Sequence, residues 1–249
     1  MSHDQLHRLL VLSYGSLLAA VAGFVNAVAI LVLAFPVGNL TATTTKLGMD
    51  VANPVLYESG ILAFIIIGFL IGAAIAGAAL GPAKRHAGAR HSGVMICEAF
   101  LLVSAFILAE DSVAVILAAM ACGMQNGTTS SLRAMQIRTT HFTGTLTDLG
   151  LLIGRSSHHG FDAWKGIVLS ATVVTFIAGG IAGTVAGSRI GDVALLIPAG
   201  MCIAVAVAGL GYDLWRTACI RNQPEPAHGI DYEDDEIGDD ATATRHHVG

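Results

Sequence analysis

Charged and aromatic residues are scarce in this chain. Asp, Glu, Lys and Arg make up 12% of its 249 residues and aromatic residues 6%, whereas a soluble domain carries about a quarter charged residues. Apolar residues reach 54%, and the mean hydropathy is +0.68. No basic stretch with interleaved aromatics is present, so we expect no nucleic-acid partner. The composition indicates a chain whose main surroundings are the lipid bilayer.

Cysteines are few, and enzyme and metal motifs are missing. Cys97, Cys122, Cys202 and Cys219 lie in or beside apolar runs, too far apart for a CxxC pair. They are typical of small packing residues. The GxSxG, Walker, dinucleotide and HExxH motifs are not found, and the ten histidines read as solvated loop residues. We therefore expect no metal, no cofactor and no enzymatic activity.

Long apolar runs are what the chain has instead. A helix needs about 20 apolar residues to cross a bilayer, and six runs reach or approach that length: Leu9–Leu33, Val55–Leu80, Gly93–Ala109, Val113–Ser131, Trp164–Ser188 and Val193–Leu214. The sequence thus predicts an all-α integral membrane protein with about six transmembrane helices in residues 9–220. Residues 1–8 form a short N-terminus, and residues 221–249 an acidic tail predicted to be disordered in the cytoplasm.

The charges between these runs predict their orientation. The connection between the third and fourth runs has only Glu110 and Asp111, and two other connections hold most of the basic residues: Lys84, Arg85, Arg90, Arg133, Arg138, Arg155 and Lys165. Lys and Arg favour the cytoplasmic side. With six spans, both termini and the two basic connections are predicted to be cytoplasmic.

Three short motifs recur in the same order in both halves of the chain. They are AGFVNA at 22–27 with CGMQNG at 122–127, GNLT at 38–41 with GTLT at 144–147, and AGAALG at 76–81 with AGSRIG at 186–191. The motifs predict two three-helix repeats, at about 9–109 and 113–214. An odd number of spans per repeat inverts the second one in the bilayer, a pattern typical of transporters and channels.

Polar residues inside the spans are the first candidates for a site. Asn26 and Asn126 occupy matching places in the repeats, and Gln125 precedes the second. In one interpretation the two asparagines face each other and line a substrate path. In the other, each is a hydrogen-bonded strut between helices, worth about 0.6 kcal/mol. The sequence leaves both open.

Two threonine-rich segments follow the first and fourth spans, Asn39–Gly48 and Thr143–Gly150. Their length suits half-helices that dip into the membrane, the first from the external side and the second from the cytoplasm. Helix N-termini carry partial positive charge and bind anionic groups. The candidate substrate-binding residues of these segments are Gly38, Asn39, Thr41, Thr143, Gly144 and Thr147. An interfacial amphipathic turn is the alternative for each segment.

Ionisable residues near the apolar core are few. Glu98 in the third span is a candidate to carry a proton or pair with a cation, and snorkelling to water is its alternative. Asp148 lies in the second threonine-rich segment, where an ion pair with Arg133 or Arg138 would anchor it. We group these four residues as charge-coupling candidates.

Glycines recur every four residues in two of the spans. The rows are Gly183, Gly187 and Gly191, Gly68 with Gly72, and Gly77 with Gly81. Such rows favour close helix crossings. We expect these crossings within one chain; a homo-oligomer interface is the alternative.

Two stretches resemble the signature regions of the YoaK-like family of bacterial membrane proteins. They read GFVNAVAILVLAFPVGNLTATTTKLG and AAMACGMQNGTTSSLRAMQIRTTHFTGTLTDLG, and the likeness covers roughly residues 10–215. The first departs from the family pattern at Asn26, where Asp is common, and at Val37, where Thr is common. The resemblance implies a multi-pass protein of the bacterial inner membrane and supplies no substrate.

Three functions fit these observations. The leading hypothesis is a transporter or channel for an unknown small solute, with its site between the asparagines and the two threonine-rich segments. The second is a membrane assembly or sensor protein without transport, and the third a lipid-active membrane enzyme. A cavity that reaches both Asn26 and Asn126 favours the first, and a core closed by side chains favours the second.

Overall fold

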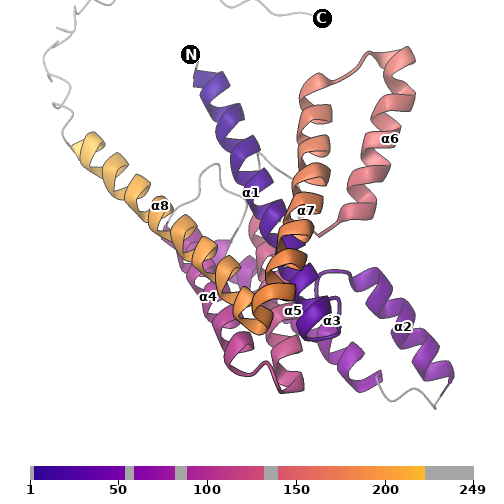
Figure 1. Ribbon diagram of the computed structural model, residues 1–249. Helices are drawn as coiled ribbons and strands as arrows, with labels where there is room; N and C mark the ends of the chain where they lie inside the picture. Colours follow the sequence, from indigo (N-terminus) through magenta and orange to yellow (C-terminus); the bar gives the residue numbers. More distant parts are fainter. Residues whose placement is uncertain (1–2, 54–58, 82–88, 132–139, 222–249) are drawn as a thin grey trace, which may run out of the picture.

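The structure is a computed structural model that describes residues 3–53, 59–81, 89–131 and 140–221 (Figure 1). All regular structure in these ranges is helical, which confirms the all-α prediction. The elements are α1 (His3–Val32), α2 (Leu40–Ala52), α3 (Ser59–Leu80), α4 (Ala89–Ile107), α5 (Ser112–Ser130), α6 (Phe142–His159), α7 (Ala163–Ile190), the 3₁₀ helix η1 (Gly191–Leu195) and α8 (Leu196–Arg221). The acidic tail predicted to be disordered lies beyond the described residues.

Four helical stretches in the described residues are long and apolar enough to cross a membrane. They are Arg8–Val32, Gly60–Leu80, Ala89–Ile107 and Ala163–Trp215. The last covers 53 residues and joins α7, η1 and most of α8, which is long enough for two crossings of a core about 30 Å thick. Helix α5 is outside these stretches, because its last turns carry Gln125, Asn126 and two threonines that lower its hydropathy.

The long helices pack in pairs, α1 along α7, α3 along α5 and α4 along α8. In Figure 1 the start of α1, the α6–α7 turn and the end of α8 lie at the upper end of the bundle. The end of α2, the α4–α5 turn and η1 lie at the lower end. Helices α2 and α6 both begin near the centre and run outward, α2 downward beside α3 and α6 upward beside α7.

Two of these pairs cross with their backbones in contact. Four glycines make this possible, because a Cβ atom on any of them would lie 2.0 Å from a carbonyl oxygen of the opposite helix: Gly23 from Phe176 and Gly179 from Ala20 at the α1–α7 crossing, Gly72 from Met120 and Gly123 from Phe69 at the α3–α5 crossing. Contacts this short leave no room for a side chain. Close approach through small residues stabilises helix pairs in membranes, where burial of apolar surface contributes little.

The predicted glycine rows are correct in part. Gly68, Gly72, Gly183 and Gly187 face the partner helix of their pair, as expected. Gly77, Gly81 and Gly191 would meet nothing within 4 Å, so the prediction of close crossings at these three positions is wrong. Gly81 and Gly191 have φ of 65° and 59° and end α3 and α7. A residue in this left-handed conformation stops a helix, and glycine adopts it without a Cβ penalty.

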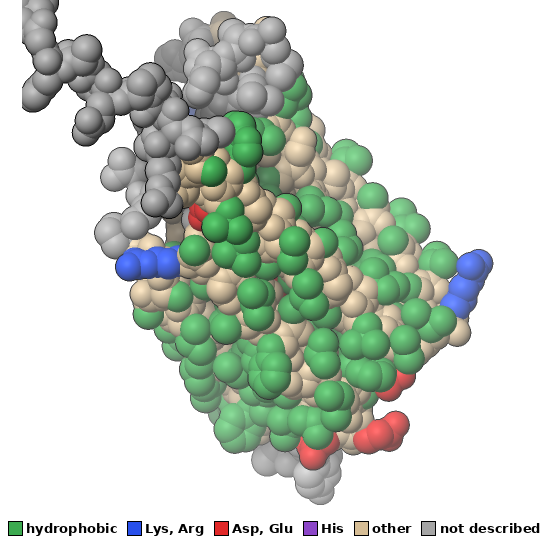
Figure 2. Space-filling view, turned by 90° about the vertical axis from the view of Figure 1, so that its left-hand side faces the viewer, with side chains coloured by type: hydrophobic (Ala, Val, Ile, Leu, Met, Phe, Trp, Pro, Cys, Tyr) green, Lys and Arg blue, Asp and Glu red, His purple; other side chains and the backbone are tan. Residues whose placement is uncertain are grey.

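Apolar side chains cover much of the outer surface. Figure 2 shows hydrophobic side chains over most of the side formed by α4 and α8. Phe100 on α4 is 70% exposed and Val207 on α8 is 63% exposed. Small and branched apolar residues fill the interior among α1, α4, α5 and α8, with Val28 and Leu102 fully buried. An apolar exterior around a packed core suits lipid as the surrounding solvent.

Replacement of Gly179 by Ala should lower the melting temperature of the protein in detergent. The new methyl group collides with the backbone of Ala20 and forces α1 and α7 apart, at a cost of about 1–3 kcal/mol. Gly200→Ala in α8 is the matched control, because nothing lies within 4 Å of a Cβ there and Ala favours a helix. Equal melting temperatures for Gly179→Ala and the wild type would show that this crossing does not limit stability.

Candidate functional site

Helix α1 stops just before the first threonine-rich segment. Leu33 still donates its N–H to the carbonyl of Ala29, but Ala34 takes a left-handed conformation with φ of 63°. Pro36 then follows, and proline has no N–H to continue the helical hydrogen bonds. The backbone stays non-helical until α2 begins at Leu40. Residues 33–39 thus form a non-helical linker between the long helix α1 and the half-helix α2.

Asn26 and Asn126 make equivalent hydrogen bonds to residues just ahead of the two half-helices. The N–H of Gly38 donates to Asn26 Oδ1 over 3.0 Å, and the N–H of Thr140 donates to Asn126 Oδ1 over 3.2 Å. Asn126 also donates from Nδ2 to the hydroxyl of Thr140. Non-helical backbone in an apolar bundle needs such partners for its polar groups. The asparagines therefore act as struts, each between a long helix and a residue, Gly38 or Thr140, that lies two residues ahead of the next half-helix.

The two half-helices match in a different register from the one predicted. The sequences TATTTKLG at 41–48 and TGTLTDLG at 143–150 begin one residue inside α2 and α6 respectively. Thr43 and Thr145 each donate a hydroxyl hydrogen bond to the carbonyl of the N-cap residue, over 3.1 Å in both helices. Their offset is 102, whereas the predicted pairing of Gly38–Thr41 with Gly144–Thr147 has an offset of 106.

That prediction is wrong by four residues, which is about one helical turn. The predicted register places only Thr41 on a threonine, Thr147, whereas the corrected register places three threonines of α2 on three of α6. The corrected register pairs Lys46 of α2 with Asp148 of α6. The two half-helices thus share three hydroxyl positions, and Lys46 of one corresponds to the oppositely charged Asp148 of the other.

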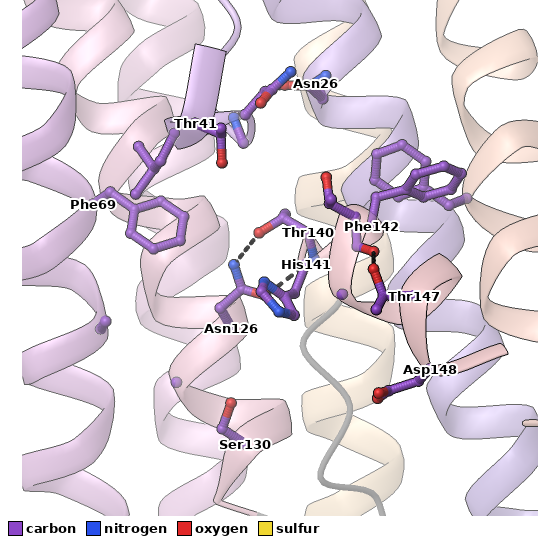
Figure 3. A pocket seen from close by; sticks show the side chains of 18 residues that line it. Asn26, Thr41, Phe69, Asn126, Ser130, Thr140, His141, Phe142, Thr147 and Asp148 are labelled. Carbon is purple, nitrogen blue, oxygen red and sulfur yellow. Dashed lines mark hydrogen bonds between the residues drawn. The ribbon is translucent and has the colours of Figure 1, made fainter. Parts of the chain in front are cut away.

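A cavity of about 900 Å³ lies where the two half-helices begin. Figure 3 shows Asn26 and Thr41 on one side of it and Asn126 and Thr140 on the other. Gly38 and Thr140 lie close together at this cavity, since a Cβ added to Gly38 would lie 3.2 Å from the Thr140 methyl carbon. The N-termini of α2 and α6 therefore converge near the centre of the bundle.

The structure brings most of the predicted site residues together. The cavity is lined by Asn26, Gly38, Asn39, Thr41, Asn126, Thr143, Gly144, Thr147 and Asp148. Gln125 lies elsewhere: it is 1% exposed, and its Nε2 donates to the carbonyl of Leu18 over 3.3 Å. Glu98 is buried among α1, α4, α5 and α8, away from the cavity. Arg133 and Arg138 lie outside the described residues, and Asp148 forms no ion pair within them.

Sequence reasoning missed several residues that line the cavity. Phe69 of α3 and Phe176 of α7 belong to apolar runs, where one aromatic residue looks like any other packing residue. Phe142 also lines it, with its ring centroid 5.3 Å from that of Phe176. Thr140 and His141 directly precede α6 and could have been found from the corrected register. The cavity thus combines polar helix ends with aromatic walls.

The chemistry that the cavity offers is mainly hydrogen bonding. The first N–H groups of a helix have no partner within it, and they carry partial positive charge. Asn39 satisfies one of them, accepting from the N–H of Ala42 over 3.2 Å. The others in the first turns of α2 and α6 adjoin the cavity. Asp148 is the acidic residue among its lining side chains, and His141 the titratable base. A small polar or anionic group suits this lining.

These observations define an α-helical membrane protein with a polar cavity at the N-termini of the two half-helices, α2 and α6. The chain belongs to the family of proteins of unknown function DUF1275, which matches residues 14–208. This match agrees with the resemblance to the YoaK-like family. No curated protein and no solved structure matches the chain.

Replacement of Asn26 by Leu should release the first linker. The N–H of Gly38 then loses its acceptor, which costs about 1–3 kcal/mol for a buried group. Hydrogen–deuterium exchange measured by mass spectrometry should become faster in residues 33–39. Asn26→Asp is the matched control, because a carboxylate oxygen also accepts this hydrogen bond and should keep exchange near the wild-type rate. Unchanged exchange in Asn26→Leu would show that the linker is held by other contacts.

Proposed function

We propose that this protein transports or conducts a small solute across the bacterial inner membrane, and that the cavity between Asn26 and Asn126 is its binding site. The single observation that carries this proposal is the convergence of two half-helix N-termini and two equivalent asparagines on one cavity of about 900 Å³. A core closed by side chains would have supported a protein without transport. Instead, the polar residues of both halves adjoin the same space.

The arrangement of the helices supports an inverted repeat. Helix α1 packs on α7 and α5 packs on α3, so the first long helix of each half pairs with the long helix that follows the half-helix in the other. The half-helices run from the centre to opposite ends of the bundle (Figure 1). Under the proposed orientation both termini are cytoplasmic, α2 opens to the external side and α6 to the cytoplasm. Sites between inverted repeats with interrupted helices are typical of secondary transporters.

The solute is expected to be small, polar and able to accept hydrogen bonds. Free N–H groups of the two first turns would bind a carboxylate, phosphate or similar group. Aromatic rings of Phe69, Phe142 and Phe176 would pack against its less polar part. Asp148 in the same cavity disfavours a solute with several negative charges, so a single anionic group or a zwitterion fits best.

A membrane assembly or sensor protein is the second candidate. One observation favours it: Asn26 and Asn126 both hold linkers, which is a structural role that needs no solute. The two candidates differ in what the cavity does. A transporter exposes its cavity to water from one side and then the other, whereas a sensor or assembly protein has no need of access from both sides.

Cysteine labelling with a membrane-impermeant thiol reagent tests access to the cavity. In a background without native cysteines, Thr41→Cys and Thr143→Cys, which line the same cavity, should each react with reagent applied from the external side and with reagent applied from the cytoplasmic side. Asp111→Cys and Arg155→Cys calibrate the two sides, the first external and the second cytoplasmic. Phe100→Cys, on the apolar outer face, should react from neither. A cavity that reacts from neither side, or an inverted result at position 111, contradicts the proposal.

Uptake by proteoliposomes tests transport itself. Radiolabelled amino acids, short carboxylic acids and phosphorylated metabolites are offered as a panel, and at least one should accumulate with wild-type protein. Asn126→Leu should abolish its uptake, because the cavity loses a polar wall and the α5–linker strut. Thr184→Val, which removes an exposed hydroxyl of α7 at a residue that does not line the cavity, should leave uptake intact. Equal uptake by wild type and Asn126→Leu would rule out this cavity as the path.

A further inference from the structure

Glu98 lies in the middle of α4 and is 2% exposed. Its Oε2 atom is buried and has no hydrogen-bond partner. No Lys or Arg in the described part of the chain forms an ion pair with it. An ionised carboxylate taken out of water without a counterion is strongly destabilising, so a group in this position holds its proton. Glu98 is therefore a neutral carboxylic acid in this packing of the helices.

Weak acids on three neighbouring helices lie near this carboxyl group. Tyr14 of α1, Cys122 of α5 and Cys202 of α8 are its electrostatic neighbours, and the Cys202 thiol is within hydrogen-bonding reach. Helix α3 has no titratable side chain in its described residues. Asp192 of η1 accepts from the N–H of Val193. None of these groups supplies a fixed positive charge.

A line of polar groups leads from Glu98 to the start of α4. His91, Met95 and Glu98 are spaced four and three residues apart, which places them on one face of the helix. His91 Nε2 is hydrogen-bonded to the Tyr14 hydroxyl, and that hydroxyl also lies 4.0 Å from the Met95 sulfur. His91 Nδ1 and the neighbouring Ser92 hydroxyl are buried without partners. Since α4 begins at Ala89, His91 stands within its first turn.

We propose that Glu98 is a proton-binding site, and that His91 and Tyr14 relay the proton between it and the water at the N-terminal end of α4. Binding forms the O–H bond of the carboxylic acid and release breaks it, with the proton passed along the imidazole and hydroxyl groups. The site is separate from the solute cavity, which none of these three residues lines. Glu98 has no acidic counterpart in α8, because the paired segment Leu196–Leu210 carries no Asp or Glu. This difference between the two helices supports a specific role for Glu98.

Coupling of this proton to solute movement rests on the proposed function, but proton binding does not. A movement of α8 away from α4 would expose the carboxyl group to water and release its proton. Conversely, protonation would favour the closed packing. The experiment below measures the carboxyl group directly, so a failure of transport in proteoliposomes leaves its outcome unaffected.

Infrared spectroscopy of purified full-length protein at neutral pH should show the C=O stretching band of a protonated carboxyl group, and transfer to D₂O should shift it. Glu98→Gln should remove this band. Glu110→Gln, at an exposed acid in the α4–α5 turn, should leave it unchanged. Absence of the band in the wild type, or its persistence in Glu98→Gln, overturns the proposal.

Two further variants keep the test decisive if Glu98→Gln does not fold. Cys202→Ser places a stronger hydrogen-bond donor beside the carboxyl group and should lower the frequency of the band, which assigns it to Glu98. Tyr14→Phe keeps the aromatic ring and removes the relay hydroxyl. It should slow the deuterium shift of the band by about a hundredfold, the lower end of what a positioned proton-transfer group contributes. An unchanged frequency in Cys202→Ser overturns the site, and an unchanged exchange rate in Tyr14→Phe overturns the relay.

Discussion

Non-helical backbone is the constraint on which the centre of this protein depends. In an apolar bundle, peptide groups outside a helix must find partners or line a polar space. Asn26 and Asn126 provide the partners, accepting from the N–H groups of Gly38 and Thr140. The cavity provides the polar space, because the first turns of α2 and α6 open into it. The asparagine hydrogen bonds and the polar cavity thus both compensate for backbone polar groups that lie outside a helix.

The glycine crossings place these struts. Gly23 precedes Asn26 by three residues, and Gly123 precedes Asn126 by three, so each glycine shares a helix face with its asparagine. Each glycine contacts the backbone of the opposite helix. The asparagine one turn further on then lies within hydrogen-bonding distance of Gly38 or Thr140. A backbone contact also leaves the helix little freedom to rotate. The crossing therefore sets the position of the hydrogen bond that holds the cavity wall.

The two halves of the chain share their scaffold and differ in their charges. Asparagines, linkers and threonine hydroxyls occur in both, whereas Lys46 in α2 corresponds to Asp148 in α6, and Glu98 in α4 faces a thiol of α8. The shared residues satisfy backbone groups that both halves must satisfy. Charges are costly in an apolar environment and are kept where they serve a task. We expect the direction of transport and the binding of a proton to arise from these differences in charge, because the scaffold is nearly the same in both halves.

The sequence by itself determined the helical class, the positions of the long helices and nine of the 18 residues that line the cavity. Apolar length is a local property, and matched motifs such as GFVNA and GMQNG mark equivalent places without any structure. Only the tertiary structure decided the register of the two half-helices, because the short motifs GNLT and GTLT match each other one turn away from the register that the helices adopt. It also separated Gln125 from its neighbour Asn126, since adjacent residues on a helix point about 100° apart, and the packing of α5 on α3 and α1 selects which one faces the cavity.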